Sequence, residues 1–190
     1  SLFQQPVTAE GDSAQLRRKL GFDGHLVCMY LGAHGAYNAL WTIIEAAEAL
    51  RDDPQYLFVL VGDGDEKARL QRMVQERQLG NVRFLPPRPR AQTPELLRAA
   101  DLFLLPNRRG EFYTMNLPNK LFDFLASGRP IVVAGYGETA NLIQQAGAGR
   151  VVPAEDSAAM AQAVVELANL SDKGRSAMGA AGRQYVLRHY

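Results

Sequence analysis

The sequence predicts an α/β fold: a doubly wound, mostly parallel six-stranded sheet with helices on both faces. Short apolar runs alternate with amphipathic helical stretches, which is the order expected of βαβ units. Most of these runs are apolar almost throughout, as is typical of strands covered by helices on both sides. No repeat or low-complexity linker interrupts the pattern, and 190 residues suffice for one well-buried domain but not for two of ordinary size.

Six strands are expected in chain order, each a short apolar run next to polar or turn-forming residues. They lie at 26–31, 56–61, 82–85, 102–105, 131–134 and 150–152. Cys28 lies inside the first run, so we expect it to be buried and unreactive. A single cysteine rules out an internal disulfide and favours a reducing compartment, which points to the cytoplasm.

Helices are expected between the strands, because their apolar residues recur every three or four positions. These stripes are Leu40, Ile43, Ile44, Ala47 and Leu50, then Leu70, Met73 and Val74, and then Met160, Ala163, Val164 and Leu167. The second helix is expected to end near Gly80, and the third to begin after the acidic pair Glu155 and Asp156. An Ala-rich segment at 173–189 predicts the last helix. Residues 1–12 are interpreted as a lead-in and 13–190 as the domain.

Composition excludes several classes of function. A net charge of +1 gives no global field to attract nucleic acid or acidic membranes. No apolar run approaches the roughly 18–20 residues that cross a bilayer. The histidines are scattered and the cysteine is alone, so no zinc site is expected, and no nucleophile elbow occurs.

Two loops after the first two strands could contact a ligand at the carboxyl edge of the sheet. Gly32 and Gly35 allow close backbone approach, although an ordinary strand-to-helix turn explains them as well. His34 alone is more typical of a surface or supporting residue than of a catalyst. In the second loop, Asp63 and Asp65 are interpreted as caps of the next helix, with a nucleoside contact as the alternative.

The strongest anion site predicted by the sequence is the start of the helix at 118–125. Pro118 suits a first helical turn, and the N–H groups near Asn119 and Lys120 are then exposed donors at a positive helix end. Lys120 adds a full charge, and Asp123 on the same face could accept sugar hydroxyls. The alternative is an ordinary Lys–Asp pair on a solvated helix, worth about 0.2–0.5 kcal/mol.

Several motifs occur in a specific order along the chain. They are Tyr30-Leu31-Gly32, 58–64, 81–85, 99–106, 117–120 and the Ala-Ser-Gly-Arg-Pro turn at 126–130. Together they resemble the C-terminal, donor-binding domain of the retaining glycosyltransferases of family 4, over nearly the whole chain. The segment 118–124 is similar to a variant found in bacterial surface-polysaccharide transferases. The resemblance implies a Rossmann-like half of a GT-B fold whose N-terminal acceptor domain is missing here.

The resemblance also implies roles for individual residues. The donor diphosphate would lie against Gly32, Gly35, Asn119 and Lys120, and Asp123 would bind the ribose. The base would lie near Pro87 and Arg88. A loop with Arg109, Glu111, Met115 and Asn116 would face the donor sugar or the phosphates.

This sequence departs from the family pattern at a few positions. Ala33 and Asn38 stand where many relatives carry an arginine and a lysine. Met115 takes the place of the first of two paired acids, when the second is aligned with Asp123. Another register pairs Glu111 with Asn119 but breaks the match to the Gly-Arg-Pro turn.

The implied activity is transfer of a sugar from a nucleotide-diphosphate sugar to a glycan or lipid-linked acceptor, without a cofactor or metal. No catalytic residue is expected in this domain, and the isolated domain is expected to be inactive. Any contact with the inner membrane face would be made through the missing half. Half of a sugar-nucleotide epimerase and a non-catalytic interaction domain are the alternatives.

Overall fold

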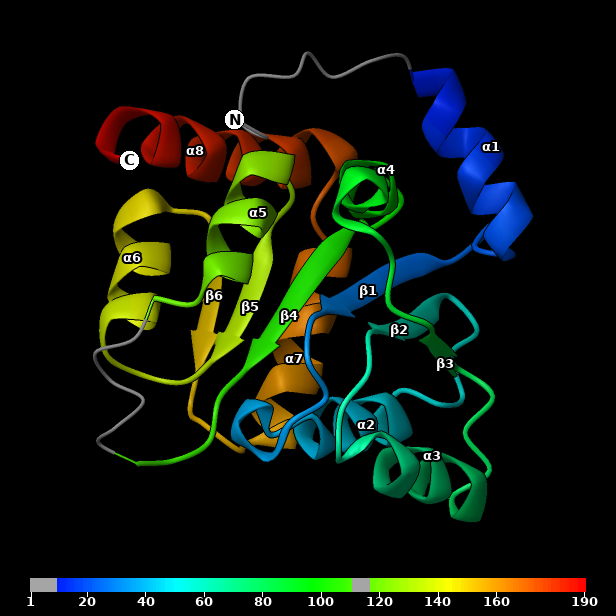
Figure 1. Cartoon of the computed structure of the whole chain (residues 1–190). Coiled ribbons are helices and arrows are strands. Elements are labelled where there is room, and N and C mark those ends of the chain that lie inside the picture. Colours follow the sequence, from blue (N-terminus) through cyan, green and yellow to red (C-terminus); the bar gives the residue numbers. More distant parts are fainter. Residues whose placement is uncertain (1–9, 111–116) are drawn as a thin grey trace.

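The sheet has six parallel strands in the order β3-β2-β1-β4-β5-β6 (Figure 1). The computed structural model describes residues 10–110 and 117–190. The strands are β1 (Leu26–Leu31), β2 (Tyr56–Val61), β3 (Val82–Leu85), β4 (Leu102–Pro106), β5 (Ile131–Ala134) and β6 (Gly149–Val152). The predicted doubly wound α/β fold is therefore confirmed, and every strand is parallel to its neighbours. Only β4 and β6 differ from the prediction, each by one residue.

Helices follow the strands along the chain. They are α1 (Glu10–Leu20), α2 (Trp41–Ala49), α3 (Lys67–Glu76), α4 (Thr93–Arg98), α5 (Asn119–Ser127), α6 (Glu138–Ala146), α7 (Ser157–Ala168) and α8 (Asp172–His189), with short 3-10 turns η2 (Ala36–Asn38) and η3 (Arg90–Gln92). Of these, α1, α4 and α6 were not anticipated. Within the described residues, no helix is long and apolar enough to cross a membrane.

The end of α3 corrects one prediction. The helix stops at Glu76, and Gln78 adopts a left-handed conformation with φ of 54°. The N–H of Leu79 then donates to the carbonyl of Val74 at 3.0 Å, and the side chain of Leu79 enters the core. The cap near Gly80 was therefore wrong, because burial of Leu79 turns the chain two residues earlier.

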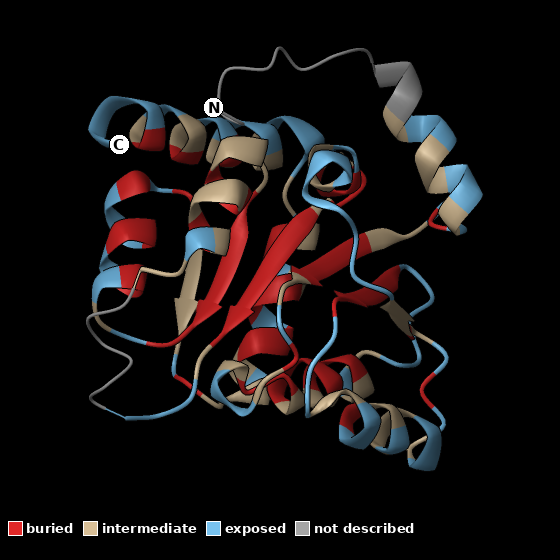
Figure 2. Ribbon diagram, in the orientation of Figure 1, coloured by how far each residue is buried: buried red, intermediate tan, exposed pale blue. Residues whose placement is uncertain are grey.

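Alternate residues of each strand face two separate hydrophobic cores. Helices cover both faces of the sheet, and its central strands are buried (Figures 1 and 2). Met29 packs with α4, α5 and α6 on one face of the sheet. Cys28 and Tyr30 pack with α2, α3 and α7 on the other face. Cys28 is fully buried, as predicted. The period of two residues along a strand explains why both faces need apolar side chains.

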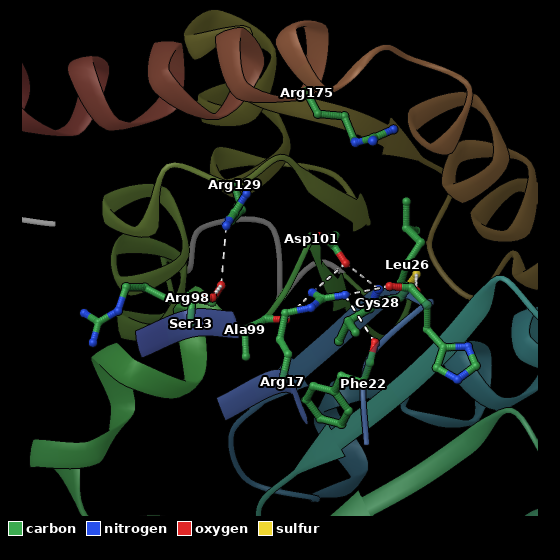
Figure 3. A network of polar contacts seen from close by, with 12 residues as sticks. Ser13, Arg17, Phe22, Leu26, Cys28, Arg98, Ala99, Asp101, Arg129 and Arg175 are labelled. Carbon is green, nitrogen blue, oxygen red and sulfur yellow. Dashed lines mark hydrogen bonds and ion pairs between the residues drawn. The ribbon is translucent and has the colours of Figure 1, made fainter. Parts of the chain in front are cut away.

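A polar network fixes α1 to the amino ends of β1 and β4 (Figure 3). The Arg17 guanidinium lies 2.9 Å from the Asp101 carboxylate. It also donates to the carbonyls of Phe22, His25 and Ala99 at 3.3, 2.7 and 2.8 Å. Asp101 in turn accepts the N–H of Val27 at 2.8 Å. Both terminal nitrogens of the guanidinium thus donate hydrogen bonds, and these hold α1 to the sheet.

Helix α8 packs against the carboxyl end of α5. Gly128 ends α5 in a left-handed conformation with φ of 72°. A Cβ at Gly179 of α8 would lie 1.8 Å from the Gly128 carbonyl oxygen, so the helices meet at backbone distance. The predicted helix, Gly-Arg-Pro turn and strand therefore form as expected, with α8 packed on the turn.

Candidate functional site

The loops after β1 and β2 pack directly against each other at the carboxyl edge of the sheet. His34 N–H donates to the Asp63 carbonyl at 2.8 Å, and the His34 carbonyl accepts the N–H of Glu66 at 2.9 Å. Gly62 has φ of +144°, and a Cβ there would lie 2.0 Å from the Gly32 carbonyl oxygen. A side chain at Gly62 is therefore excluded by the neighbouring loop as well as by the backbone conformation.

A cleft of about 330 Å³ opens between these loops and the segment after β3. Gly32 and Asp63 line one part of it, and Pro87, Arg88 and Thr93 line another. Its floor includes the last residues of β1 and β2. The structure thus brings Pro87 and Arg88, which were predicted to lie near the base, together with the first glycine loop. Thr93 was not singled out from the sequence.

Lys120 lies at the start of α5 and reaches the carboxyl end of β1. Pro118 is the N-cap of the helix and supplies no side-chain cap, so the first N–H groups of α5 have no side-chain acceptor there. The Lys120 ammonium donates to the hydroxyl of Tyr30 at 2.6 Å and to Oδ1 of Asn38 at 2.9 Å. It also lies 4.5 Å from the centroid of the Tyr30 ring, a cation–π distance.

Gly32 makes room for this ammonium. Its φ is +150°, and a Cβ there would lie 3.0 Å from Nζ of Lys120. Burial lowers the pKa of Lys120 to about 8, because an ammonium removed from water favours its neutral form. The lack of a side chain at Gly32 therefore leaves space for Lys120, which is distant in sequence. It would also allow a ligand to approach the backbone closely.

Tyr30 and Asn38 are functional candidates that sequence reasoning missed. In the sequence, Tyr30 was interpreted as an apolar strand residue, and Asn38 as the position where many relatives carry a lysine. The Tyr30 hydroxyl and the Asn38 amide both donate to the carbonyl of Ala33, at 2.8 and 2.9 Å. Asn38 has no charge of its own, but its side chain is hydrogen-bonded to the ammonium of Lys120.

Lys120 and Asp123 take different partners. No ion pair between them occurs in the described part of the chain. Asp123 is half-buried, and burial raises its pKa while the nearby Arg90 opposes the rise. The ordinary Lys–Asp surface pair, considered as an alternative, is therefore not what the helix forms.

His34 is buried, so of the two positions expected for it, at the surface or in support of the site, the surface position is excluded. Neither ring nitrogen has a hydrogen-bond partner among the described residues. The ring lies between those of Tyr30 and Phe84, with centroids 6.1 and 6.0 Å away. Burial, and then the charge of Lys67, lower its pKa to about 4. The side chain is therefore a neutral imidazole at neutral pH.

Asp63 and Asp65 do not cap α3, which corrects another prediction. The N-cap residue is Glu66, without a side-chain hydrogen bond. Asp63 instead accepts the N–H of Gly64 at 2.9 Å and lies 3.8 Å from the Lys67 ammonium. Lys67 also donates to the Gly62 carbonyl at 2.9 Å, which places a second cation beside the cleft. By contrast, the acidic start of α7 is confirmed, since Asp156 accepts the N–H of Ala159 at 2.8 Å.

Of the other predicted site residues, Gly35 and Asn119 lie beside the Lys120 cluster, Arg109 contacts the loop after β6, and the rest lie outside the described residues. Arg109 donates to the Ala154 carbonyl at 3.0 Å and lies 3.6 Å from Glu155, in the loop after β6. Asn119 is exposed at the start of α5, and Gly35 precedes η2. Glu111, Met115 and Asn116 lie outside the described residues. Among those described, no three His, Cys, Asp or Glu residues are grouped so as to hold a metal.

Curated relatives of the chain are glycosyltransferases. The chain is 37% identical over 138 residues to the Escherichia coli K12 protein named "Putative colanic acid biosynthesis glycosyl transferase WcaI", covering 72% of this chain and 33% of that protein. It is 32% identical over 199 residues to the D-inositol 3-phosphate glycosyltransferase of Salinispora tropica, covering 96% of this chain and 40% of that protein. The chain thus spans less than half of the length of these relatives.

Solved structures share the fold at low sequence identity. The Anabaena protein Alr3699/HepE, in complex with UDP-glucose, superposes with a TM-score of 0.84 at 20% identity, covering 96% of this chain and 50% of that one. WaaG, a glycosyltransferase involved in lipopolysaccharide biosynthesis, gives a TM-score of 0.76 at 21% identity, covering 94% of this chain and 47% of that one. The Rossmann-like fold thus matches GT-B glycosyltransferases.

The family follows from the sequence match itself. Residues 25–169 match the model of the family described as "Glycosyl transferases group 1". This span runs from the residue before β1 to the end of α7 and so includes the cleft, Lys120 and both glycine loops. With this match and the curated relatives, the chain belongs to the glycosyl transferases group 1 family.

Proposed function

We propose that this chain is the donor-binding half of a retaining glycosyltransferase of family 4. The full-length protein transfers a sugar from a nucleotide-diphosphate sugar to a glycan or lipid-linked acceptor, in the synthesis of a bacterial surface polysaccharide. The observation that carries the proposal is the position of the Lys120 ammonium, beside the first turn of α5 and the carboxyl end of β1. Parallel α/β sheets bind ligands at that edge, where the strand order reverses between β1 and β4.

In the proposed donor pose, the diphosphate meets two sources of positive charge, the start of α5 and the Lys120 ammonium. The diphosphate lies against Gly32 and Gly35 and accepts hydrogen bonds from the first turn of α5, at Asn119 and Lys120. As the sugar leaves, negative charge grows on the diphosphate, and the helix end and the ammonium stabilise it. The proposal therefore needs no metal ion for this neutralisation.

The nucleoside occupies the cleft in this proposal. The base lies near Pro87 and Arg88, which line the cleft together with Gly32. Asp123, one helical turn after Lys120, accepts the ribose hydroxyls. The volume of about 330 Å³ falls in the range of small-molecule sites.

The relatives support the donor and the pathway. HepE is described in complex with UDP and with UDP-glucose, and WcaI is named for colanic acid biosynthesis. Because the chain spans only part of these proteins, we place the acceptor site and the catalytic residues in a further N-terminal half. We place the enzyme in the cytoplasm, because a single cysteine suits a reducing compartment. The isolated chain should accordingly bind nucleotide without transferring sugar.

Calorimetric titration with UDP and GDP tests the proposal directly. The native chain should bind at least one of them, and Lys120→Ala should weaken binding by roughly tenfold or more, since hydrogen bonds to charged groups are worth about 1.5–3 kcal/mol. Lys173→Ala, on exposed α8, is the matched control and should bind like the native chain. Absence of binding at millimolar nucleotide would contradict the proposal and favour a non-catalytic interaction domain.

A further inference from the structure

The ammonium of Lys120 is held by neutral partners. An ammonium has three N–H donors, and here two go to the Tyr30 hydroxyl and to Oδ1 of Asn38. Neither partner carries a charge that would cancel that of the lysine. A carboxylate in either place would form an ion pair and leave less positive charge for an anionic ligand. The arrangement therefore fixes the ammonium while keeping its charge available.

Both partners are themselves fixed by one backbone group. The carbonyl of Ala33 accepts the Tyr30 hydroxyl at 2.8 Å and the Asn38 amide at 2.9 Å. Tyr30 comes from β1 and Asn38 from η2, so the carbonyl links the strand to the turn after it. A free lysine side chain has about 2 kcal/mol of rotamer entropy to lose when it binds a ligand. Holding the side chain beforehand removes part of that cost.

We propose that Tyr30 and Asn38 are positioning residues that hold the Lys120 ammonium at the carboxyl end of β1, where its remaining N–H meets the donor diphosphate. This inference rests on the proposed function. Gly32 completes the arrangement, because a side chain there would displace the ammonium. The two residues act through Lys120 and need not touch the ligand.

The pH dependence of the site offers a readout that a purely structural role would not change. Within the described part of the chain, the titratable side chains that interact with Lys120 from other elements are Tyr30 of β1 and His34 of the following loop. Burial raises the pKa of Tyr30 well above its usual value, and the pKa of His34 is about 4. On its own helix, Asp123 interacts with Arg90. Between neutral pH and about pH 9, Lys120 with its pKa of about 8 is thus the member of this group that changes charge.

Three variants test the proposal in the ligand-free chain. Tyr30→Phe and Asn38→Ala each remove an oxygen that accepts from the ammonium, so the midpoint of the Lys120 titration should fall below its native value. Asn38→Asp places a carboxylate there and should raise the midpoint instead. The titration is followed by NMR of the lysine methylene next to the ammonium, assigned by its loss in Lys120→Met. Tyr56→Phe, at a buried tyrosine at the amino end of β2, is the matched control and should leave the midpoint unchanged.

The same variants are then titrated with UDP and GDP. Tyr30→Phe and Asn38→Ala should weaken binding by about two- to tenfold at pH 8, the range expected for one hydrogen bond. Asn38→Asp should weaken binding although it raises the midpoint, because its carboxylate repels the diphosphate and pairs with the ammonium. Native midpoints and affinities in all three variants would overturn the inference.

The proposed function and the positioning role of Tyr30 and Asn38 can be refuted separately. If the native chain binds neither nucleotide, the proposed function fails, while the NMR titration still decides whether Tyr30 and Asn38 set the state of the ammonium. If nucleotide binds and depends on Lys120 but not on Tyr30 or Asn38, the inference fails and the proposed function stands. Should Tyr30→Phe prove unstable, the two Asn38 variants carry the test, because Asn38 is partly exposed in a turn.

Discussion

Two polar clusters lie at opposite ends of β1, and they differ in how completely their hydrogen bonds are satisfied. At the amino end, the Arg17 guanidinium has a carboxylate and backbone carbonyls as partners. At the carboxyl end, and counting the described residues alone, the Lys120 ammonium has neutral oxygens as its partners and both ring nitrogens of His34 lack partners. The first cluster therefore resembles a structural joint, and the second a site with capacity left for a ligand.

Physical cost explains the difference. A buried charge without an opposite charge lowers stability, so such a group persists where function requires it. Arg17 and Asp101 neutralise each other, and their contribution is to hold α1 against the sheet. Lys120 is less favourably placed for folding but well placed for an anion. The four predictions below test this contrast, from the largest expected effect to the smallest.

Asp101→Ala should destabilise the fold most. It would leave the Arg17 guanidinium and the Val27 N–H without their carboxylate partner, at a cost of about 3 kcal/mol in the free energy of unfolding. Urea denaturation measures this loss. Asp52→Ala, at an exposed position, should change the same quantity by less than about 0.5 kcal/mol. A stability equal to that of the native chain would show that the amino-end cluster is not a structural joint.

Lys120→Met should not lower the free energy of unfolding, in contrast to Asp101→Ala. Replacing a buried ammonium by an apolar side chain of similar length removes a desolvation cost, so the free energy of unfolding at pH 7 should stay the same or rise by about 1 kcal/mol. Nucleotide binding should fall sharply in the same protein. If this variant were destabilised as strongly as Asp101→Ala, both clusters would be structural and the contrast would disappear.

His34 should make the native fold sensitive to acid. Its pKa is about 4 in the fold against about 6.5 when unfolded, so between these values the unfolded chain binds a proton that the native chain does not. Stability contributed by the neutral ring is present above pH 6.5 and is lost as pH falls toward 4. His34→Leu should flatten this part of the profile of unfolding free energy against pH. Parallel profiles for the two proteins would refute the prediction.

Metal removal should have the smallest effect. The proposal assigns neutralisation of the diphosphate to Lys120 and the first turn of α5. The affinity for UDP or GDP should therefore agree within about twofold in magnesium chloride and in EDTA. Loss of binding in EDTA would show that the carboxyl-end cluster lacks the charge that we ascribe to it.

The sheet could be predicted well because its signal is local. Each strand is an apolar run that needs no knowledge of its neighbours, and β1, β2, β3 and β5 have the predicted bounds. The missed helices are different. Helix α4 is only six residues long, and α1 is largely polar, with Leu16 and Leu20 packed against the core and Arg17 bonded to the amino ends of β1 and β4. The stability of these two helices comes from tertiary contacts, which periodicity does not report. Helix α6 does carry an apolar stripe, Leu142, Ile143 and Ala146, and was missed all the same.

The candidate site divides in the same way. Asn119 and Lys120 were singled out because a proline followed by a helix predicts exposed N–H groups; α5 does begin at Asn119, and the binding role of both residues stays a prediction. Asp63 was misassigned as a cap, because its carboxylate accepts the N–H of Gly64 and lies near the Lys67 ammonium, while Glu66 is the N-cap residue of α3. An aspartate before a helix can either cap the helix or bond within the preceding loop. Packing of the loops after β1 and β2 against each other favours the second arrangement here.

By itself the sequence determined the α/β class, the strand bounds to within one residue and the helix that begins near Pro118, since all of these depend on residues a few positions apart. Only the tertiary structure decided where the charge of Lys120 goes, because its partners Tyr30 and Asn38 are 90 and 82 residues away along the chain. It also decided that His34 is buried and that Gly32 leaves space for an ammonium. Such contacts arise when strands and helices assemble, and no local pattern encodes them.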